Sequence, residues 1–433
     1  MRTKPILFSF SFLKSCNNDD LSESLQSGGY GNDFSTTVID CIEKYINITR
    51  GTDDTRASSD SYEITPYIIN GDTALYVVNY DSGWQIFSNS FKAPLVLAFS
   101  ETGNLDINDE VFKDSPLSSY IESLVSGVSL LDRSLVRFPK DSLGFNQLDT
   151  TQATIYPEPY LENIDTLSIL EKNHLIQTKW GNKSPWNRYV KLAPNGSGSM
   201  EHAQVGCGAV AVGQYLFYKQ HNGYSNLEAM SNAVYDSINN EYAFSNPSSS
   251  IWGKMAMTYV EANENPYLGD SAAVFLGDIS KSISTFFAVE GTGSTATTQK
   301  NYLNSCGFNF VYSAIDYDYI IDQLANNEPV VIQIQSPVGG HACLVDGYRI
   351  ENFRATFHMI TMGGVSQTVY RDYSIRYICM NWGWDGVSDE VWLVASNDAE
   401  WNVVYYNEQL NNPNPNPISF PSNYSRTMLK HSN

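Results

Sequence analysis

The sequence predicts an α+β protein built from two successive globular units. Short apolar or alternating runs separated by turn residues fill the chain from about residue 60 to residue 100, as in antiparallel strands. In the second half, apolar residues at helical spacing come first, and runs rich in Val, Ile and Tyr follow them. Helices followed by antiparallel strands indicate the α+β class. The 433 residues, 42% of them hydrophobic and 13% aromatic, suffice for two or three folded cores.

The first unit is expected over residues 37–139. Apolar positions recur at helical spacing from Thr37 to about Arg50 and again from Leu117 onward. Four strands are predicted between these helices: Ile64–Ile69, Ala74–Tyr80, Trp84–Asn89 and Pro94–Phe99. The residues at 81–83, which end in glycine, are predicted to form a hairpin turn.

A linker exposed to proteolysis is predicted over residues 140–172, where Pro157 and Pro159 accompany weak periodicity. The second unit is expected over residues 173–407. Its predicted elements are the helices Cys207–Tyr218 and Leu227–Tyr242 and the strands Val330–Gln335, His341–Tyr348, Thr368–Asn381 and Glu390–Ala395. Residues 408–433 are interpreted as a Pro/Asn-rich tail, because repeated prolines prevent a helix or a central strand.

The N-terminus resembles an abbreviated bacterial export signal. A basic start precedes the apolar residues 6–13, and the four residues that end at Cys16 resemble a lipobox with Cys16 as the lipid acceptor. Residues 1–16 are therefore interpreted as a signal peptide, and residues 17–36 as a polar tether. Lys14 departs from the lipobox pattern, which leaves an ordinary cleaved signal or a misassigned start as alternatives. We expect an exported protein, either a lipoprotein of the bacterial cell surface or outer membrane, or a secreted protein.

Composition argues against several classes of protein. A formal net charge of −21 disfavours nucleic-acid binding, for which a basic face is usual. The cysteines form no CxxC pair, and no HExxH appears, so neither a metal site nor a cofactor is expected. Apart from Cys16 and Cys207, the cysteines are predicted to be buried thiols and not a disulfide framework. No stretch of 18 apolar residues follows the signal, so no transmembrane helix is predicted.

Cys207 is the candidate nucleophile. It lies between Gly206 and Gly208 at the predicted start of a helix. Unpaired N–H groups and the positive end of the helix dipole favour a thiolate at such a position. Taken alone, the same small-residue run also fits a tightly packed helix start without chemistry.

His341 is the candidate base. It follows Gly339 and Gly340 and opens an apolar strand. It lies 134 residues after Cys207, within the ~130–150 residues expected between a papain-type cysteine and its histidine. A structural core histidine is the alternative for His341 in isolation, but the pairing with Cys207 favours the catalytic interpretation. Cys343 shares a strand face with His341 and is interpreted as a packed thiol beneath the site.

Asn381 and Trp382 end an apolar strand 40 residues after His341. A catalytic imidazole must be held in one tautomer and one orientation. Asn381 is predicted to accept the ring N–H of His341, and Trp382 to shield this contact or to stack on the ring. Two core tryptophans in a turn are the alternative.

Acyl transfer also requires hydrogen-bond donors for an oxyanion. The backbone N–H of Cys207 is one candidate, and the side-chain amide of Asn182 is the other. Gln177 and Gln204 are rivals that the sequence does not separate from Asn182.

Several segments carry a common pattern when taken together: Thr178–Asn182, Val205–Ala211, Gly339–Ala342, Val345–Gly347 and Asn381–Gly386. With them, the second unit resembles streptopain-like cysteine peptidases, family C10 of the papain superfamily. The segment from Leu75 to Ser100 is similar to the inhibitory prodomain of that family. The likeness spans about residues 60–400.

The resemblance implies a papain-like catalytic domain, with a helical half and an antiparallel-sheet half, preceded by a small α+β prodomain. It implies a zymogen of an endopeptidase that cleaves proteins or peptides without a cofactor. Its own prodomain, as an intramolecular inhibitor, would keep His341 from Cys207 until the linker is cut. Gly293 and Ser294 match a loop that lines the pocket for a hydrophobic substrate side chain, and Gly339 and Gly340 are expected beside the substrate.

Three departures from the family pattern stand out. Asn182 occupies the oxyanion position where streptopain has the longer Gln. The chain between Tyr348 and Asn381 is longer than in streptopain, which predicts an extended hairpin near residues 352–376 overhanging the site. The tail is also extra and receives no role.

Two other functions remain open at this point. One is a non-catalytic surface binding lipoprotein on the same fold. The other is a papain-like acyl transferase or amidase.

Overall fold

A computed structural model describes residues 33–50, 61–69, 71–90, 93–133, 160–222, 251–336, 339–360, 366–395 and 425–432. The predicted signal peptide with Cys16, most of the predicted tether and the predicted helix 227–242 lie outside these residues. Within the described ranges, no helix is long and apolar enough to cross a membrane.

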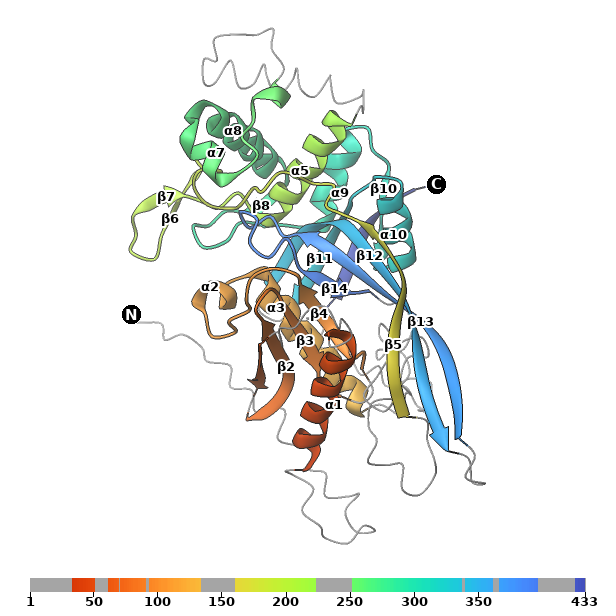
Figure 1. The fold of residues 1–433 in the computed structure, drawn as a ribbon. Helices are drawn as coiled ribbons and strands as arrows, with labels where there is room; N and C mark the ends of the chain where they lie inside the picture. Colours follow the sequence, from red (N-terminus) through yellow and green to blue (C-terminus); the bar gives the residue numbers. More distant parts are fainter. Residues whose placement is uncertain are drawn as a thin grey trace, which may run out of the picture.

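The N-terminal unit packs helices against an antiparallel meander (Figure 1). Its elements are α1 (Asp33–Arg50), β1 (Tyr62–Ile69), β2 (Asp72–Tyr80), β3 (Trp84–Ser88), β4 (Val96–Ser100), α2 (Glu110–Lys113) and α3 (Pro116–Arg133). The two helices and four strands predicted here are all present, although α1 begins inside the predicted tether. Val38 and Ile42 of α1 and Leu124 of α3 are fully buried in the core that the strands share. Gly83, at φ +81°, provides the predicted turn between β2 and β3.

The C-terminal unit has a helical half and a sheet half. The helical half contains α5 (Cys207–His221), the 3₁₀ turn η3 (Ile251–Lys254), α7 (Tyr259–Glu264), α8 (Pro266–Ile283) and α9 (Ala296–Ser305). Short strand pairs accompany it: β6 (Leu192–Pro194) with β7 (Met200–His202), and β8 (Ser284–Phe286) with β9 (Gly293–Ser294). Its own core surrounds the fully buried Trp180, Trp186 and Phe275. The α+β class and the division into a helical and an antiparallel-sheet half are confirmed.

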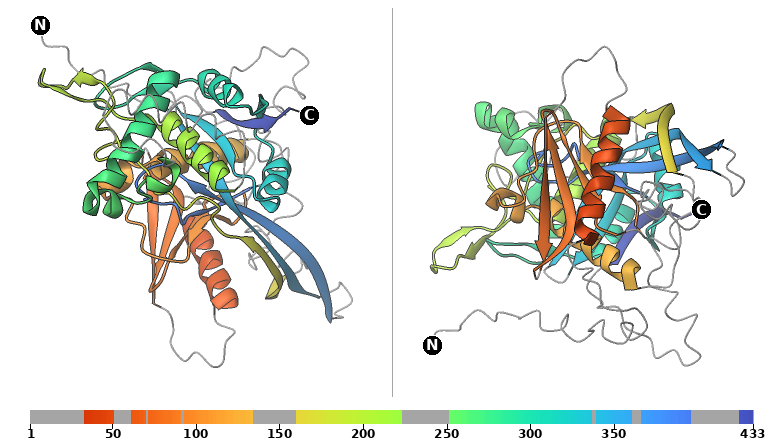
Figure 2. Two further views of the ribbon diagram at one scale, coloured as in Figure 1. Left: turned by 90° about the horizontal axis from the view of Figure 1, so that it is seen from above. Right: turned by 60° about the horizontal axis from the view of Figure 1, so that its bottom comes forward.

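The sheet half contains β10 (Phe310–Ala314), α10 (Tyr317–Ala325), β11 (Val330–Ser336), β12 (Gly339–Ile360), β13 (Ser366–Asn381), β14 (Trp392–Val394) and β15 (Ser425–His431). In the described part of the chain, β4 of the N-terminal unit pairs with β14, with Phe99 opposite Trp392. One antiparallel sheet therefore runs through both units in the order β1-β2-β3-β4-β14-β13-β12-β11-β15-β10. Figure 2 shows from two further directions how the two units adjoin.

The last part of the predicted tail belongs to the folded sheet. Residues 425–431 form β15, which lies between β10 and β11 and pairs with both. The interpretation of residues 408–433 as an appendage is therefore wrong for this last strand. The run SRTMLKH contains no proline, and its Met428 and Leu429 are buried in the two cores.

The predicted linker is also corrected in its second half. Residues 160–172 form β5 (Tyr160–Lys172), which pairs with β12 along its length. Prolines at 157 and 159 precede this strand and do not interrupt it, so the backbone N–H groups it needs for pairing are intact.

The long hairpin is present, but it does not overhang the site. β12 and β13 pair from Leu344 opposite Asn381 to Ile360 opposite Ser366. At ~3.3 Å per residue, the end of β12 lies about 60 Å along the strand from His341. Figures 1 and 2 show β5, β12 and β13 projecting away from the helical half of the C-terminal unit.

Candidate active site

Cys207 is the first residue of α5. Gly206 precedes it at φ +93°, a conformation that favours glycine, and every residue from Gly208 to Phe217 is buried. The helix start is thus fixed by packing. The Ala342 N–H of β12 donates to Cys207 Sγ at 3.4 Å, and the Gly208 N–H also donates to the thiol.

His341 hydrogen-bonds to the Cys207 thiol, so the structure brings together the two residues that the sequence paired. Burial acts to raise the thiol pKa, but the charge and hydrogen bond of His341 and the Ala342 and Gly208 amides outweigh it. The pKa of Cys207 therefore lies below its usual value. Burial acts to lower the pKa of His341, but the thiolate and a backbone carbonyl outweigh it, so this pKa is raised. Both shifts favour a thiolate–imidazolium pair.

The expected separation of the pair by the N-terminal unit is not observed. The hydrogen bond between His341 and Cys207 is present although that unit is in place and shares the sheet. α5, which begins at Cys207, and β12, which carries His341, both belong to the C-terminal unit and pack on each other.

The group that orients His341 is a backbone carbonyl. His341 Nε2 donates to the Trp382 carbonyl oxygen at 2.7 Å, which leaves the other ring nitrogen for the thiol. The predicted contact of Asn381 with the imidazole is wrong: the Asn381 amide donates to the Thr178 carbonyl at 2.9 Å, and its oxygen accepts from Gly383 N–H at 3.1 Å. Asn381 thus holds the turn that presents the Trp382 carbonyl.

Trp382 is fully buried and lies beside the histidine. Its ring centroid is 6.2 Å from that of His341, at an interplanar angle of 37°, so it covers the imidazole without parallel stacking. On its other side, Tyr120 of α3 meets the indole edge-on at 5.9 Å. The N-terminal unit therefore contacts the group next to the imidazole.

Asn182 lies against the segment that leads to Cys207. Its backbone carbonyl accepts from Val205 N–H at 2.9 Å, and its side chain is 4% exposed. The side-chain nitrogen donates to the Gly383 carbonyl at 3.4 Å, which is long for a hydrogen bond, and Oδ1 has no partner among the described residues. Of its rivals, Gln177 is exposed and Gln204 is buried, with its backbone N–H bonded to the Ala288 carbonyl.

The predicted substrate loop lies beside the nucleophile. Ser294 Oγ and Gln299 Nε2 approach the Cα of Gly208 so closely that a Cβ would overlap both. Ser294 accepts from Gln299 at 3.0 Å, while Gly293 lies under the Phe286 ring. Gly339 and Gly340 pair with the end of β11, and Gly340 is exposed.

A second group of ionisable residues, which the sequence analysis missed, adjoins Trp382 through Asp389, which accepts the Trp382 N–H. Asp346 bonds through its carboxylate to His174 Nδ1 at 3.1 Å and to the Ile176 N–H at 3.2 Å. Cys379 Sγ lies 3.5 Å from His174 Nε2 and donates to the Asp389 carbonyl oxygen at 3.0 Å. The only signal for this group in the sequence was Asp346, the acidic residue directly after the apolar run that contains His341.

Cys343 is a buried free thiol near Met380, as predicted, and burial raises its pKa well above the usual value. Among the described residues, no group of three or more His, Cys, Asp and Glu side chains is arranged to hold a metal ion.

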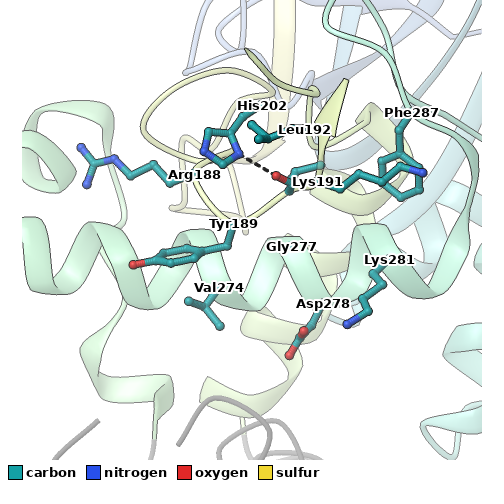
Figure 3. Close-up of a pocket in the computed structure, with 11 residues that line it drawn as sticks. Arg188, Tyr189, Lys191, Leu192, His202, Val274, Gly277, Asp278, Lys281 and Phe287 are labelled. Carbon is teal, nitrogen blue, oxygen red and sulfur yellow. Dashed lines mark hydrogen bonds between the residues drawn. The ribbon is translucent and has the colours of Figure 1, made fainter. Parts of the chain in front are cut away.

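A cavity of about 550 Å³ lies outside the site, between α8 and the segment around β6 (Figure 3). It contains none of the predicted site residues. Two of its cations are engaged, because Arg188 pairs with Asp270 at 2.9 Å and Lys191 lies 4.3 Å from the centroid of the Phe287 ring.

A thiol of lowered pKa at a buried helix start, paired with an imidazole from a facing strand on an α+β scaffold, is the arrangement of a cysteine peptidase. The family model described as the Peptidase C10 family matches residues 180–392, a range that contains Asn182, Cys207, His341 and Trp382. The matched region, residues 180–392, belongs to this family, and the chain is a streptopain-like cysteine endopeptidase.

The chain is also similar to named proteins. Streptopain of Streptococcus pyogenes is 24% identical over 338 residues, which covers 73% of this chain and 72% of streptopain. Streptopain of S. pyogenes serotype M1 gives the same values. The structure of a mutant fragment of Prevotella intermedia prointerpain A has a TM-score of 0.48 at 17% identity, and covers 86% of this chain and 98% of that chain.

Proposed function

We propose that this chain is an exported cysteine endopeptidase made as a zymogen, in which Cys207 and His341 cleave peptide bonds. The observation that carries the proposal is the hydrogen-bonded Cys207–His341 pair, with the thiol pKa lowered and the imidazole pKa raised. The substrates are proteins or peptides.

In the acylation step, Cys207 Sγ attacks the carbonyl carbon of the scissile bond. His341, which carries the thiol proton, gives it to the leaving amine, and an acyl-thioester remains on Cys207. In the second step, His341 takes a proton from water, and the resulting attack releases the acid and restores the pair. The Trp382 carbonyl holds the ring through Nε2 in both steps, and Asn381 fixes that carbonyl through Gly383.

The Cys207 N–H and the Asn182 amide are the proposed oxyanion donors. The long contact of Asn182 Nδ2 to Gly383 is a weak competitor, so this donor is available to a negative oxygen. The resemblance places Gln here, one methylene longer, so the proposal requires that the loop bearing Asn182, which is bonded to Val205, compensates for the shorter side chain. Gly293, Ser294, Gly339 and Gly340 are proposed to line the substrate groove.

The N-terminal unit, residues 37–139, is proposed to inhibit by coverage. Its β4 pairs with β14 and its Tyr120 packs on Trp382, so it occupies the side of the site next to the indole while the catalytic pair stays assembled. Because β5 is a paired strand, the activating cut is proposed to fall before Tyr160. Export, and lipidation of Cys16, rest on the N-terminal sequence pattern.

The test compares the full wild-type chain with its Cys207→Ala variant. We expect the wild type to bind a general thiol-protease affinity label stoichiometrically, to cleave casein and to process itself, whereas the variant does none of these. N-terminal sequencing of the mature product locates the cut. Labelling without cleavage would favour the acyl transferase or amidase, and the absence of labelling after limited proteolysis would favour the binding protein.

A further inference from the structure

Hydrogen bonds fix both the carbonyl and the N–H group of the Trp382 backbone. Its carbonyl accepts from His341 Nε2 at 2.7 Å, and its N–H donates to Asp389 Oδ1 at 2.9 Å. The indole N–H donates to the Ser388 carbonyl at 3.0 Å. The residue that orients the imidazole is thus itself fixed by the loop that carries Asp389.

Asp389 occupies an unusual position for a carboxylate. It is 4% exposed, and its backbone carbonyl accepts from Cys379 Sγ at 3.0 Å. A hydrogen bond from an amide to a buried carboxylate is stronger than one between neutral groups, because the charge is poorly screened. Burial of this group is expensive for the fold, so a role for its contact with Trp382 is a natural explanation.

The ionisable groups around Asp389 come from several elements. Asp346 of β12 repels its charge, while His174 and Lys179, from the segment after β5, attract it. Cys379 of β13 contacts its backbone, and Glu390 adjoins it in the loop. Burial, together with Asp346, raises the pKa of Asp389 to about 7. Either form of the carboxyl group keeps an oxygen that can accept the Trp382 N–H, so the contact persists when the group titrates.

We propose that Asp389 is a positioning residue of this peptidase: by fixing the N–H of Trp382, it aims the Trp382 carbonyl at His341 and so keeps the imidazole directed at Cys207. Asp389 touches neither the substrate nor the reacting atoms. The inference rests on the proposed roles of Cys207 and His341.

The experiment compares Asp389→Ala, Asp389→Asn and Glu328→Gln in the full chain. The Asn variant keeps an acceptor oxygen, whereas the Ala variant removes it. Glu328 is the matched control, because it is a partly buried carboxylate held by Lys219 and Tyr215 near the other end of α5. We measure kcat and KM on a peptide substrate, and the rate of Cys207 alkylation by iodoacetamide as a function of pH.

We expect Asp389→Ala to lower kcat by about tenfold or more with little change in KM, and to move the alkylation profile toward higher pH, because a misdirected imidazole stabilises the thiolate less. Asp389→Asn should retain kcat within about threefold, and Glu328→Gln should leave both readouts unchanged. A folded Asp389→Ala protein with the wild-type kcat and alkylation profile would overturn the inference. So would equal losses in the Asn and Ala variants.

Two further measurements keep the outcome decisive. If the Ala variant does not fold, Asp389→Leu takes its place, because Leu has a similar size but no acceptor oxygen. The NMR signal of the His341 Nε2 proton is then compared between wild type, Asp389→Asn and Asp389→Leu. We expect a shift for Asp389→Leu alone, and an unmoved signal in this variant refutes the proposal. His341→Ala separates the two claims: if it leaves Cys207 alkylation unchanged, the proposed function fails, whereas an effect of His341→Ala without one of Asp389→Ala refutes only the positioning role.

Discussion

Asp389 also predicts how the stability of the protein depends on pH. Its pKa is raised from 3.8 to about 7 in the folded chain, mainly by burial. The folded state therefore binds a proton more tightly than the unfolded state does. The stabilisation from this proton is fully present below about pH 4 and is lost as pH rises through about 7. A shift of about three pKa units corresponds to roughly 4 kcal/mol of unfolding free energy.

The perturbation is Asp389→Asn in a Cys207→Ala background, which removes self-cleavage. The neutral amide keeps the acceptor for the Trp382 N–H but carries no charge to desolvate. We expect the variant and its parent to have similar stability near pH 4, and the variant to become more stable than the parent as pH rises, by up to about 4 kcal/mol near pH 8.

The assay is urea unfolding of both proteins, followed by fluorescence, at several pH values between about 4 and 8. The difference between the two proteins cancels the titration of groups that do not interact with Asp389. His174 does interact with Asp389, so its titration contributes to the difference; the pKa of His174 is raised by Asp346 and Asp389 against the effect of burial. A difference that stays constant with pH, or a variant that becomes relatively less stable at high pH, would refute the reasoning.

Three further predictions follow from the packing around the site. Gly208→Ala places a methyl group against Ser294 and Gln299, so the start of α5 must move; we expect kcat/KM to fall by about tenfold or more, and an unchanged value would contradict the tight packing. Asn182→Ala should lower kcat by about a hundredfold with little effect on KM, while Asn182→Gln retains or raises turnover; a hundredfold loss in the Gln variant would mean that the loop is specific for Asn. Deletion of residues 425–433 removes β15, so we expect a thermal unfolding midpoint several degrees lower or an insoluble chain, and wild-type melting would show that the strand is dispensable.

The sequence predicted local elements better than their partners. Periodicity and turn residues located the meander from β1 to β4, because each of its strands pairs with its neighbour along the chain. The same signals could not reveal that β4 pairs with β14 or that β15 enters between β10 and β11. Those pairings join segments far apart in the chain, and alternation of side chains carries no information about the partner strand.

In the candidate site, too, the sequence indicated some of the contacts and missed others. The residue types of Cys207 and His341 and their spacing indicated a pair, and the structure brings the two side chains into contact. The contact to the imidazole was assigned to the side chain of Asn381, but the backbone carbonyl of Trp382 makes it. Any residue can supply a carbonyl, so this contact leaves no trace in the sequence. Asp389 was missed for a related reason: its burial is produced by the tertiary fold and not by the local pattern.

The position of β15 has a consequence for the order of synthesis. β11 lies between β12, which carries His341, and β15, whose residues 425–431 come far later in the chain than either strand. Until those residues have been made, one edge of β11 lacks the strand that covers it in the finished sheet. A nascent polypeptide that has not reached β15 therefore holds its imidazole on an incomplete sheet, and we expect the assembled catalytic pair to form only after residues 425–431 have been synthesised.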